Sequence, residues 1–147
     1  MPFPLLPLVE EIVARLAPSG DRAAARSPRV TIDVDPAHVV DAEPAVARGM
    51  LHALIEAALA AASCPPAPSD APAVHEVVIT SVRQAGRLEI EIADSGPASP
   101  RALDITLAAV RSQAARIGAA LRVDGCPEGG RAVTLLLPHR AAGRMAA

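Results

Sequence analysis

A carboxylate stands where a buried strand ends, at Asp94, and Ser95 and Gly96 follow it. Apolar and polar residues alternate over 87–94, which predicts a strand with one buried face. A carboxylate at such a strand end can accept hydrogen bonds at the lip of a pocket, and a glycine allows close backbone approach. Pro97 has no backbone N–H and so ends the hydrogen bonding of the strand, which means that an ordinary strand-to-loop turn also explains these residues. Both interpretations stay open until the surrounding elements are placed.

The elements that position Asp94 follow from hydrophobic periodicity and from breaker residues. Helices are predicted over residues 5–17, 45–63 and 101–117, and strands over 29–35, 38–40, 75–84, 87–94, 120–124 and 131–137. Residues 64–73 form a Pro-rich linker, and residues 139–147 a flexible tail. This order predicts one domain over residues 1–138, a two-layer α/β sandwich with a mixed, mostly antiparallel sheet and helices on one face.

Composition limits the classes of function. The chain has 147 residues, of which 51% are hydrophobic and 1% aromatic, so we expect one domain with an aliphatic core. The 14 basic residues are all arginine, the net charge is −2, and the sequence has no basic run and no Tyr or Trp on which bases could stack. These features argue against nucleic-acid binding.

Neither a membrane location nor a metal site is expected. His52 and Glu56 interrupt the most apolar run, and the N-terminus lacks the basic region of a signal peptide, so we expect a cytoplasmic protein. Cys64 and Cys126 are interpreted as reduced thiols, because two cysteines are too few for a disulfide scaffold and their spacing is not that of metal ligands. The histidines are scattered, which gives a metal site little support.

The element order and four segments resemble the ATP-binding catalytic domain of sensor histidine kinases, which has the Bergerat fold. The segments are HALIEAALAAA in the long helix, the strand end DSG, the piece VRSQAARIGAALRV and the closing GGRAVTLLLP. The resemblance runs from about Leu5 to Pro138. It implies a domain of the histidine kinase-like ATPase type.

The long helix departs from that family at every ligand position. The family motif has the form N-L-L-x-N-A-x-K-[HY], in which the second Asn holds Mg²⁺. The matching positions that would carry Asn, Asn, Lys and His or Tyr are all alanine: Ala53, Ala57, Ala60 and Ala61. By helical spacing they share one face, which is therefore stripped of ligand groups. Glu56 falls at the variable position, and we interpret it as a helix-surface charge rather than a catalytic group.

The strand-end motif is only partly kept. Asp94 and Gly96 match D-x-G-x-G, whose Asp accepts a hydrogen bond from the adenine amino group, but Ala98 replaces the second glycine. The long ATP lid is missing. Asp104 and Thr106 stand where the phosphate-binding glycines would be, and Asp104 adds a charge that opposes anion binding. The pair Gly130-Arg131 replaces the Gly-Thr that borders the adenine pocket.

These losses predict a degenerate, catalytically inactive kinase-like domain, a pseudokinase of two-component signalling that binds a protein partner. By the resemblance, the partner is a response regulator, a kinase or a sigma-factor-type regulator, and a homodimer is a further option. No cofactor is expected, or ATP and ADP bound weakly. The alternative is that a remnant site of Asp94, Gly96, Glu56 and Gly130 still binds an adenine nucleotide. A third interpretation is an unrelated α/β sandwich. For partner contact we expect the apolar stripe of the first helix and the alanine-lined groove.

Overall fold

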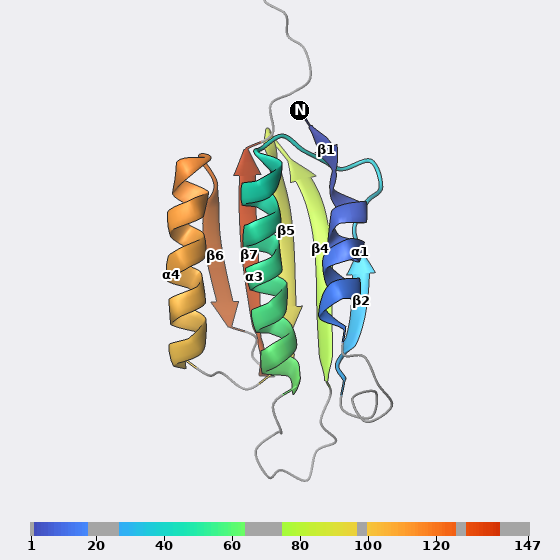
Figure 1. Cartoon of the computed structure of the whole chain (residues 1–147), viewed down its shortest axis with the longest axis vertical. Helices are drawn as coiled ribbons and strands as arrows, with labels where there is room; N and C mark the ends of the chain where they lie inside the picture. The colour runs from blue at the N-terminus through green and yellow to red at the C-terminus, as the bar shows by residue number, and fades with distance from the viewer. Residues whose placement is uncertain (1, 18–26, 64–74, 97–99, 126–128, 139–147) are drawn as a thin grey trace, which may run out of the picture.

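Five strands form one mixed sheet in the computed structural model, which describes residues 2–17, 27–63, 75–96, 100–125 and 129–138 (Figure 1). The strand order is β2-β4-β5-β7-β6; the β2–β4 pair is parallel, and the other three neighbouring pairs of these described strands are antiparallel. The bounds are β2 Arg29–Asp33, β4 Glu76–Gln84, β5 Arg87–Asp94, β6 Ala120–Gly125 and β7 Arg131–Pro138. The mixed, mostly antiparallel sheet that the sequence predicts is confirmed.

The helices of the described residues cover one face of this sheet (Figure 1). They are α1 Leu5–Leu16, α3 Pro44–Ser63 and α4 Pro100–Arg116. In Figure 1, α3 lies in front of the central strands, α4 lies beside β6, and α1 lies on the side of β2 and β4. The two-layer α/β sandwich is therefore confirmed. Cys64, Cys126, Pro97, Ala98, the linker 64–73 and the tail 139–147 lie outside the described residues.

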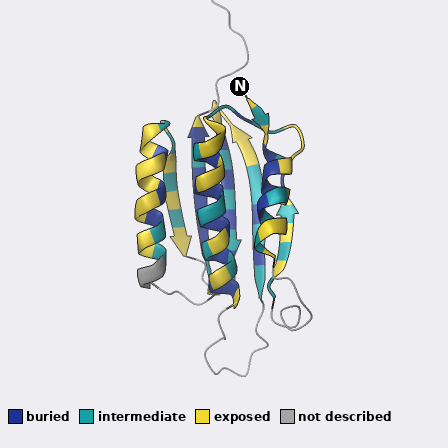
Figure 2. Cartoon of the chain, in the orientation of Figure 1, coloured by how far each residue is buried: buried dark blue, intermediate teal, exposed yellow. Residues whose placement is uncertain are grey.

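Aliphatic side chains from both layers make the core. On β5 the alternate residues Leu88, Ile90 and Ile92 are buried, as the period-two pattern predicts. Figure 2 shows the buried positions concentrated on the central strands and on the helix sides that face them. The α1 stripe takes part in this core, through Leu5, Leu8, Val9 and Ile12. The hypothesis that this stripe is free for a partner is therefore wrong, because the domain itself covers it.

The long helix α3 has the length and apolar composition of a membrane span, yet the described chain uses it as a core helix. Eight of its residues are buried: Ala47, Met50, Leu51, Leu54, Ile55, Ala58, Ala61 and Ala62. Arg48 on its outer side forms an ion pair with Glu11 of α1, with 3.0 Å between Nη1 and Oε2. The apolar content of α3 is explained by packing between the sheet and its two neighbouring helices.

A tight hairpin fixes the register of the strand that carries Asp94. Ala85 and Gly86 form the turn between β4 and β5, and both have positive φ, 27° and 80°. Such backbone angles match the twist of a two-residue hairpin. The register that follows places Val77, near the start of β4, opposite Asp94. The first residues of β4 therefore become neighbours of the candidate site.

The sequence did not predict the short β1, Phe3–Pro4, which pairs antiparallel with β3, Val39–Val40. Two residues cannot display an alternating pattern, and the prolines suggested an irregular start. The pairing lets the Leu5 N–H, at the start of α1, donate to the His38 carbonyl at 3.0 Å. This contact ties the beginning of α1 to the loop after β2.

Candidate functional site

Asp94 closes β5 in a rigid polar turn. Its side chain is 8% exposed, and its Oδ1 accepts a hydrogen bond from the Gly96 N–H at 2.9 Å. Ser95 ties the turn to the neighbouring strand, because its Oγ accepts from the Glu76 N–H at 2.9 Å and its own N–H donates to the Glu76 carbonyl at 3.1 Å. The carboxylate is thus held at one end of the sheet by backbone contacts on both sides.

Two glycines allow other segments to approach this turn closely. A Cβ atom on Gly96 would lie 2.1 Å from the carbonyl oxygen of Ala61 in α3. A Cβ atom on Gly130, which has a φ of 91°, would lie 2.1 Å from the carbonyl oxygen of Asp94. Both separations are shorter than non-bonded contact permits, so only glycine fits either position. The structure therefore brings Asp94, Gly96, Gly130 and the last turn of α3 together.

Arg131 is the charged neighbour of Asp94 across the sheet. The two residues are register partners of β5 and β7. Because side chains alternate along a strand, Arg131 shares the face of Val133 and Leu135, which are buried under the helices. The Nε of Arg131 is buried and has no hydrogen-bond partner among the described residues. From the sequence, Arg131 was noted only because it stands where the related family has threonine. The sheet register places it beside the Asp94 carboxylate.

The environment changes the acidity of Asp94. Burial raises the pKa of its carboxyl above the ordinary value, while the Gly96 N–H and then the positive charge of Arg131 lower it by less. A carboxyl group with a raised pKa binds its proton more tightly in the folded protein than in the unfolded chain. The stability of the domain should therefore depend on pH through this residue.

Replacing Asp94 with asparagine is expected to remove that pH dependence. The stabilising contribution of the raised pKa is present below about pH 4, the ordinary aspartate value, and is lost as pH rises through the folded-state pKa. The wild type should therefore lose stability relative to Asp94→Asn as pH increases over this range. Urea unfolding of both proteins across this interval measures the difference, and a difference that stays constant with pH would contradict the assignment.

The four alanines of α3 do not share one environment. Ala53 and Ala57 are half-buried, Ala60 is exposed, and Ala61 is buried against Gly96. The predicted common face is therefore a strip of these four alanines in which exposure differs, from the exposed Ala60 to Ala61, which contacts the turn at the end of β5. None of these side chains can bind a metal ion, and the described residues contain no group of three His, Cys, Asp or Glu with that arrangement.

Glu56 lies apart from the Asp94 turn. Its side chain is 63% exposed, and its Oε2 lies 3.4 Å from the Nδ1 of His52, one helical turn earlier. Five residues, about 7.5 Å along the helix axis, separate it from Ala61. The structure thus groups Asp94, Gly96 and Gly130 from the predicted remnant site but leaves Glu56 on the helix surface with His52.

His75 is a neighbour of the site that no sequence pattern indicated. Its Nδ1 lies 2.6 Å from the carbonyl oxygen of Ala62, so the ring donates a hydrogen bond to the last turn of α3. The contact satisfies one carbonyl that the helix end leaves without an intrahelical partner. It joins the segment before β4 to the same α3 turn that Gly96 touches.

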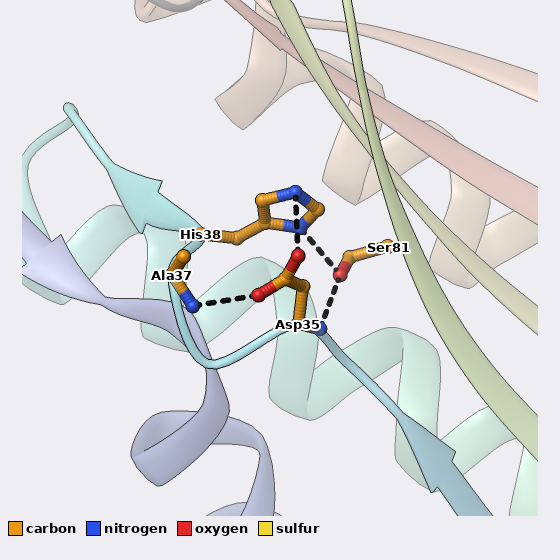
Figure 3. Close-up of polar contacts among 4 residues, drawn as sticks. All are labelled: Asp35, Ala37, His38 and Ser81. Carbon is orange, nitrogen blue, oxygen red and sulfur yellow. Dashed lines mark hydrogen bonds and ion pairs between the residues drawn. The ribbon is translucent and has the colours of Figure 1, made fainter.

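A second polar cluster has the residue types of a hydrolase triad but lies in a different arrangement (Figure 3). Ser81 Oγ accepts from the Asp35 N–H at 3.2 Å and lies 2.7 Å from His38 Nδ1. Asp35 uses its Oδ1 to accept from the Ala37 N–H at 2.8 Å, and its Oδ2 is 3.9 Å from His38 Nε2, beyond hydrogen-bond range. The cluster fastens the loop after β2 to strand β4.

The route from the strand end to the next helix is short. Only residues 97–99 separate Gly96 from α4, which begins at Pro100, one residue before the predicted start. Asp104 is exposed on α4 and Thr106 is half-buried. The connection leaves no length for the long lid that the resemblance would require.

Comparison with solved structures tests the resemblance. The catalytic domain of histidine kinase ThkA, in a nucleotide-free form, matches with a TM-score of 0.73 at 16% identity, covering 94% of this chain and 95% of that one. Histidine kinase AdeS of Acinetobacter baumannii matches with a TM-score of 0.73 at 16% identity, covering 96% of this chain and 68% of that one. The ATP-binding domain of PrrB from Mycobacterium tuberculosis matches with a TM-score of 0.65 at 21% identity, covering 96% and 98%.

Sequence comparison alone does not find these proteins. No protein-family model matches the chain, and no curated protein matches it. The likeness therefore lies in the fold. The chain has the fold of the catalytic ATPase domain of histidine kinases.

Proposed function

We propose that this chain is a catalytically inactive histidine kinase-like domain that acts as a protein-interaction module in signalling. The observation that carries the proposal is the α3 strip, where Ala53, Ala57, Ala60 and Ala61 offer no oxygen or nitrogen side-chain ligand. Phosphoryl transfer depends on positioning and on electrostatic stabilisation by a metal ion and cationic groups. A strip of methyl groups supplies neither.

The elements around α3 support the same conclusion. The short connection before α4 has no lid, and the exposed carboxylate of Asp104 opposes the approach of a triphosphate. The core, in contrast, is kept, since α1, α3 and α4 each bury aliphatic residues against the sheet. Selective loss of ligand groups with retention of the core is expected when a fold is kept as a scaffold.

A partner would be a signalling protein: a response regulator, a kinase or a sigma-factor-type regulator. Because α1 buries its apolar stripe within the domain, the contact is expected on the outer side of α3 around Ala60. Small side chains there permit another helix to come close. We place this module in the cytoplasm, where such partners act, and we expect it to bind neither nucleic acid nor membrane.

Titration with Mg-ATP and Mg-ADP tests the proposal. We expect no Mg²⁺-dependent heat of binding and no phosphate release at nucleotide concentrations up to about 1 mM. The control is an active histidine kinase catalytic domain under the same conditions. Micromolar binding that requires Mg²⁺, or any nucleotide turnover, would overturn the assignment of an inactive domain.

A second candidate function follows from the Asp94 turn. The carboxylate, Gly96 and Gly130 remain grouped at one end of the sheet, and Asp94 is the residue that the resemblance assigns to adenine. The domain would then bind a purine base without using the phosphates. Loss of nucleoside binding in an Asp94→Asn variant that is folded by circular dichroism would support this function, and no response to any purine would exclude it.

A further inference from the structure

Asp94 and Arg131 present two opposite charges that do not bond to each other. They are register partners on the helix-facing side of β5 and β7. Among the ion pairs of the described residues, none joins these two side chains. Asp94 Oδ1 accepts from the Gly96 N–H, and the described residues supply no hydrogen bond to Oδ2. Among the described residues, neither Asp94 Oδ2 nor the neighbouring Arg131 Nε has a hydrogen-bond partner, and only the Arg131 Nε is fully buried.

The unsatisfied Arg131 Nε requires an explanation. It is buried, and none of the described residues accepts a hydrogen bond from it. Most buried polar atoms in native proteins are hydrogen-bonded, and a buried donor without a partner is costly. A ligand that donates to the carboxylate and accepts from the guanidinium would satisfy both groups at once.

The chemistry of the two groups selects the ligand. A guanidinium presents two parallel N–H donors, which match a pair of adjacent acceptors such as O6 and N7 of guanine. The neighbouring N1–H of the same ring is a donor for Asp94 Oδ2. Adenine also offers a donor beside an acceptor, but its N7 is flanked by an amino group, so one guanidinium N–H would stay unpaired. Hypoxanthine presents the same lactam edge as guanine.

We propose that Asp94 and Arg131 together bind the lactam edge of a 6-oxopurine, guanine or hypoxanthine, in preference to adenine. The inference rests on the second proposed function, the retention of a base-binding half-site, and it changes the base. In this arrangement Arg131 determines specificity, and Asp94 is the common acceptor. Gly96 and Gly130 keep the backbone of the turn close to α3 and β7, which holds the two charged groups in register.

The experiment is a nuclear magnetic resonance titration of the full chain with guanosine, inosine and adenosine, followed at the Gly96 and Gly130 amides. Guanosine and inosine are expected to bind with dissociation constants about tenfold or more below that of adenosine. A difference between guanosine and inosine would show whether the 2-amino group contributes. In Arg131→Thr the preference for the 6-oxopurines should disappear.

Arg122→Thr is the matched control. Arg122 lies on β6, pairs with Asp124 at 3.0 Å and faces the opposite side of the sheet, so its loss should leave the base preference unchanged. Adenosine binding as tight as guanosine in the wild type, or no shift with guanosine up to about 1 mM, would overturn the proposal. So would an unchanged preference in a folded Arg131→Thr variant.

These experiments distinguish failure of the base-binding proposal from failure of the proposal that the domain is catalytically inactive. Failure of guanosine to bind leaves the loss of phosphoryl transfer intact, because that conclusion depends on α3. Mg²⁺-dependent binding of ATP would overturn the inactive domain whatever base Arg131 prefers. If Arg131→Thr does not fold, as judged by its circular dichroism, Arg131→Lys tests the same point, since a single ammonium cannot pair with O6 and N7 as a fork.

Discussion

Replacing Gly96 with alanine is expected to lower the free energy of unfolding by about 3 kcal/mol. The added Cβ would lie 2.1 Å from the carbonyl oxygen and 2.3 Å from the carbonyl carbon of Ala61. Both atoms belong to the α3 backbone, which cannot move as a flexible side chain could. Either the strand-end turn or the last turn of α3 must shift, so the hydrogen bond between Asp94 and Gly96 should also weaken. Urea unfolding of the two proteins measures the loss.

Gly125→Ala is the control for this effect. Gly125 ends β6, and a Cβ atom there would meet nothing within 4 Å. Its stability should stay within about 0.5 kcal/mol of the wild type. If Gly96→Ala were as stable as Gly125→Ala, the close contact between the turn and α3 would be absent, and the grouping of Asp94 with α3 would be wrong.

Replacing Ile55 with alanine is expected to cost about 3 kcal/mol of stability. Ile55 is completely buried in α3, the helix that lies over the central strands. Removing three carbon atoms leaves a cavity between helix and sheet that neighbouring side chains can fill only in part. Thermal unfolding followed by circular dichroism should show a midpoint lower by roughly 10 °C.

Ile105→Ala provides the comparison within α4. Its side chain is 74% exposed, so the same truncation should change stability by less than about 0.5 kcal/mol. The pair of variants tests whether α3 is a core helix of a globular domain. Equal, small effects at both positions would contradict the packing of α3 on the sheet. The apolar composition of α3 would then favour a membrane-spanning helix instead.

The sequence predicted most elements because each has a clear period. Leu88, Ile90 and Ile92 alternate with polar residues, and the strand predicted over 87–94 forms β5 with those bounds. The helix predicted over 101–117 forms α4 one residue earlier, at Pro100–Arg116. The strand predicted over 29–35, which is β2, ends at Asp33, and the first helix ends at Leu16 rather than residue 17. Such errors occur at element ends, where periodicity gives no signal.

The grouping of the candidate site was predictable only in part. Asp94, Gly96 and Gly130 could be named from the strand end and the closing segment, since both are local patterns. Glu56 was included by proximity to the alanine motif, and the structure places it on the helix surface with His52. The contact of His75 with Ala62 joins residues 13 apart through an intervening loop, and no local pattern encodes it.

The sequence by itself determined the element order, the aliphatic core and the absence of ligand groups along α3, because these depend on residue type and on short-range spacing. Only the tertiary structure decided which of the four alanines is buried, that Gly96 touches α3, and that Arg131 stands beside Asp94 without bonding to it. Those relations depend on strand register and on helix position over the sheet. Both arise from contacts between residues distant in the chain, such as Ala61 and Gly96, which no local pattern can encode.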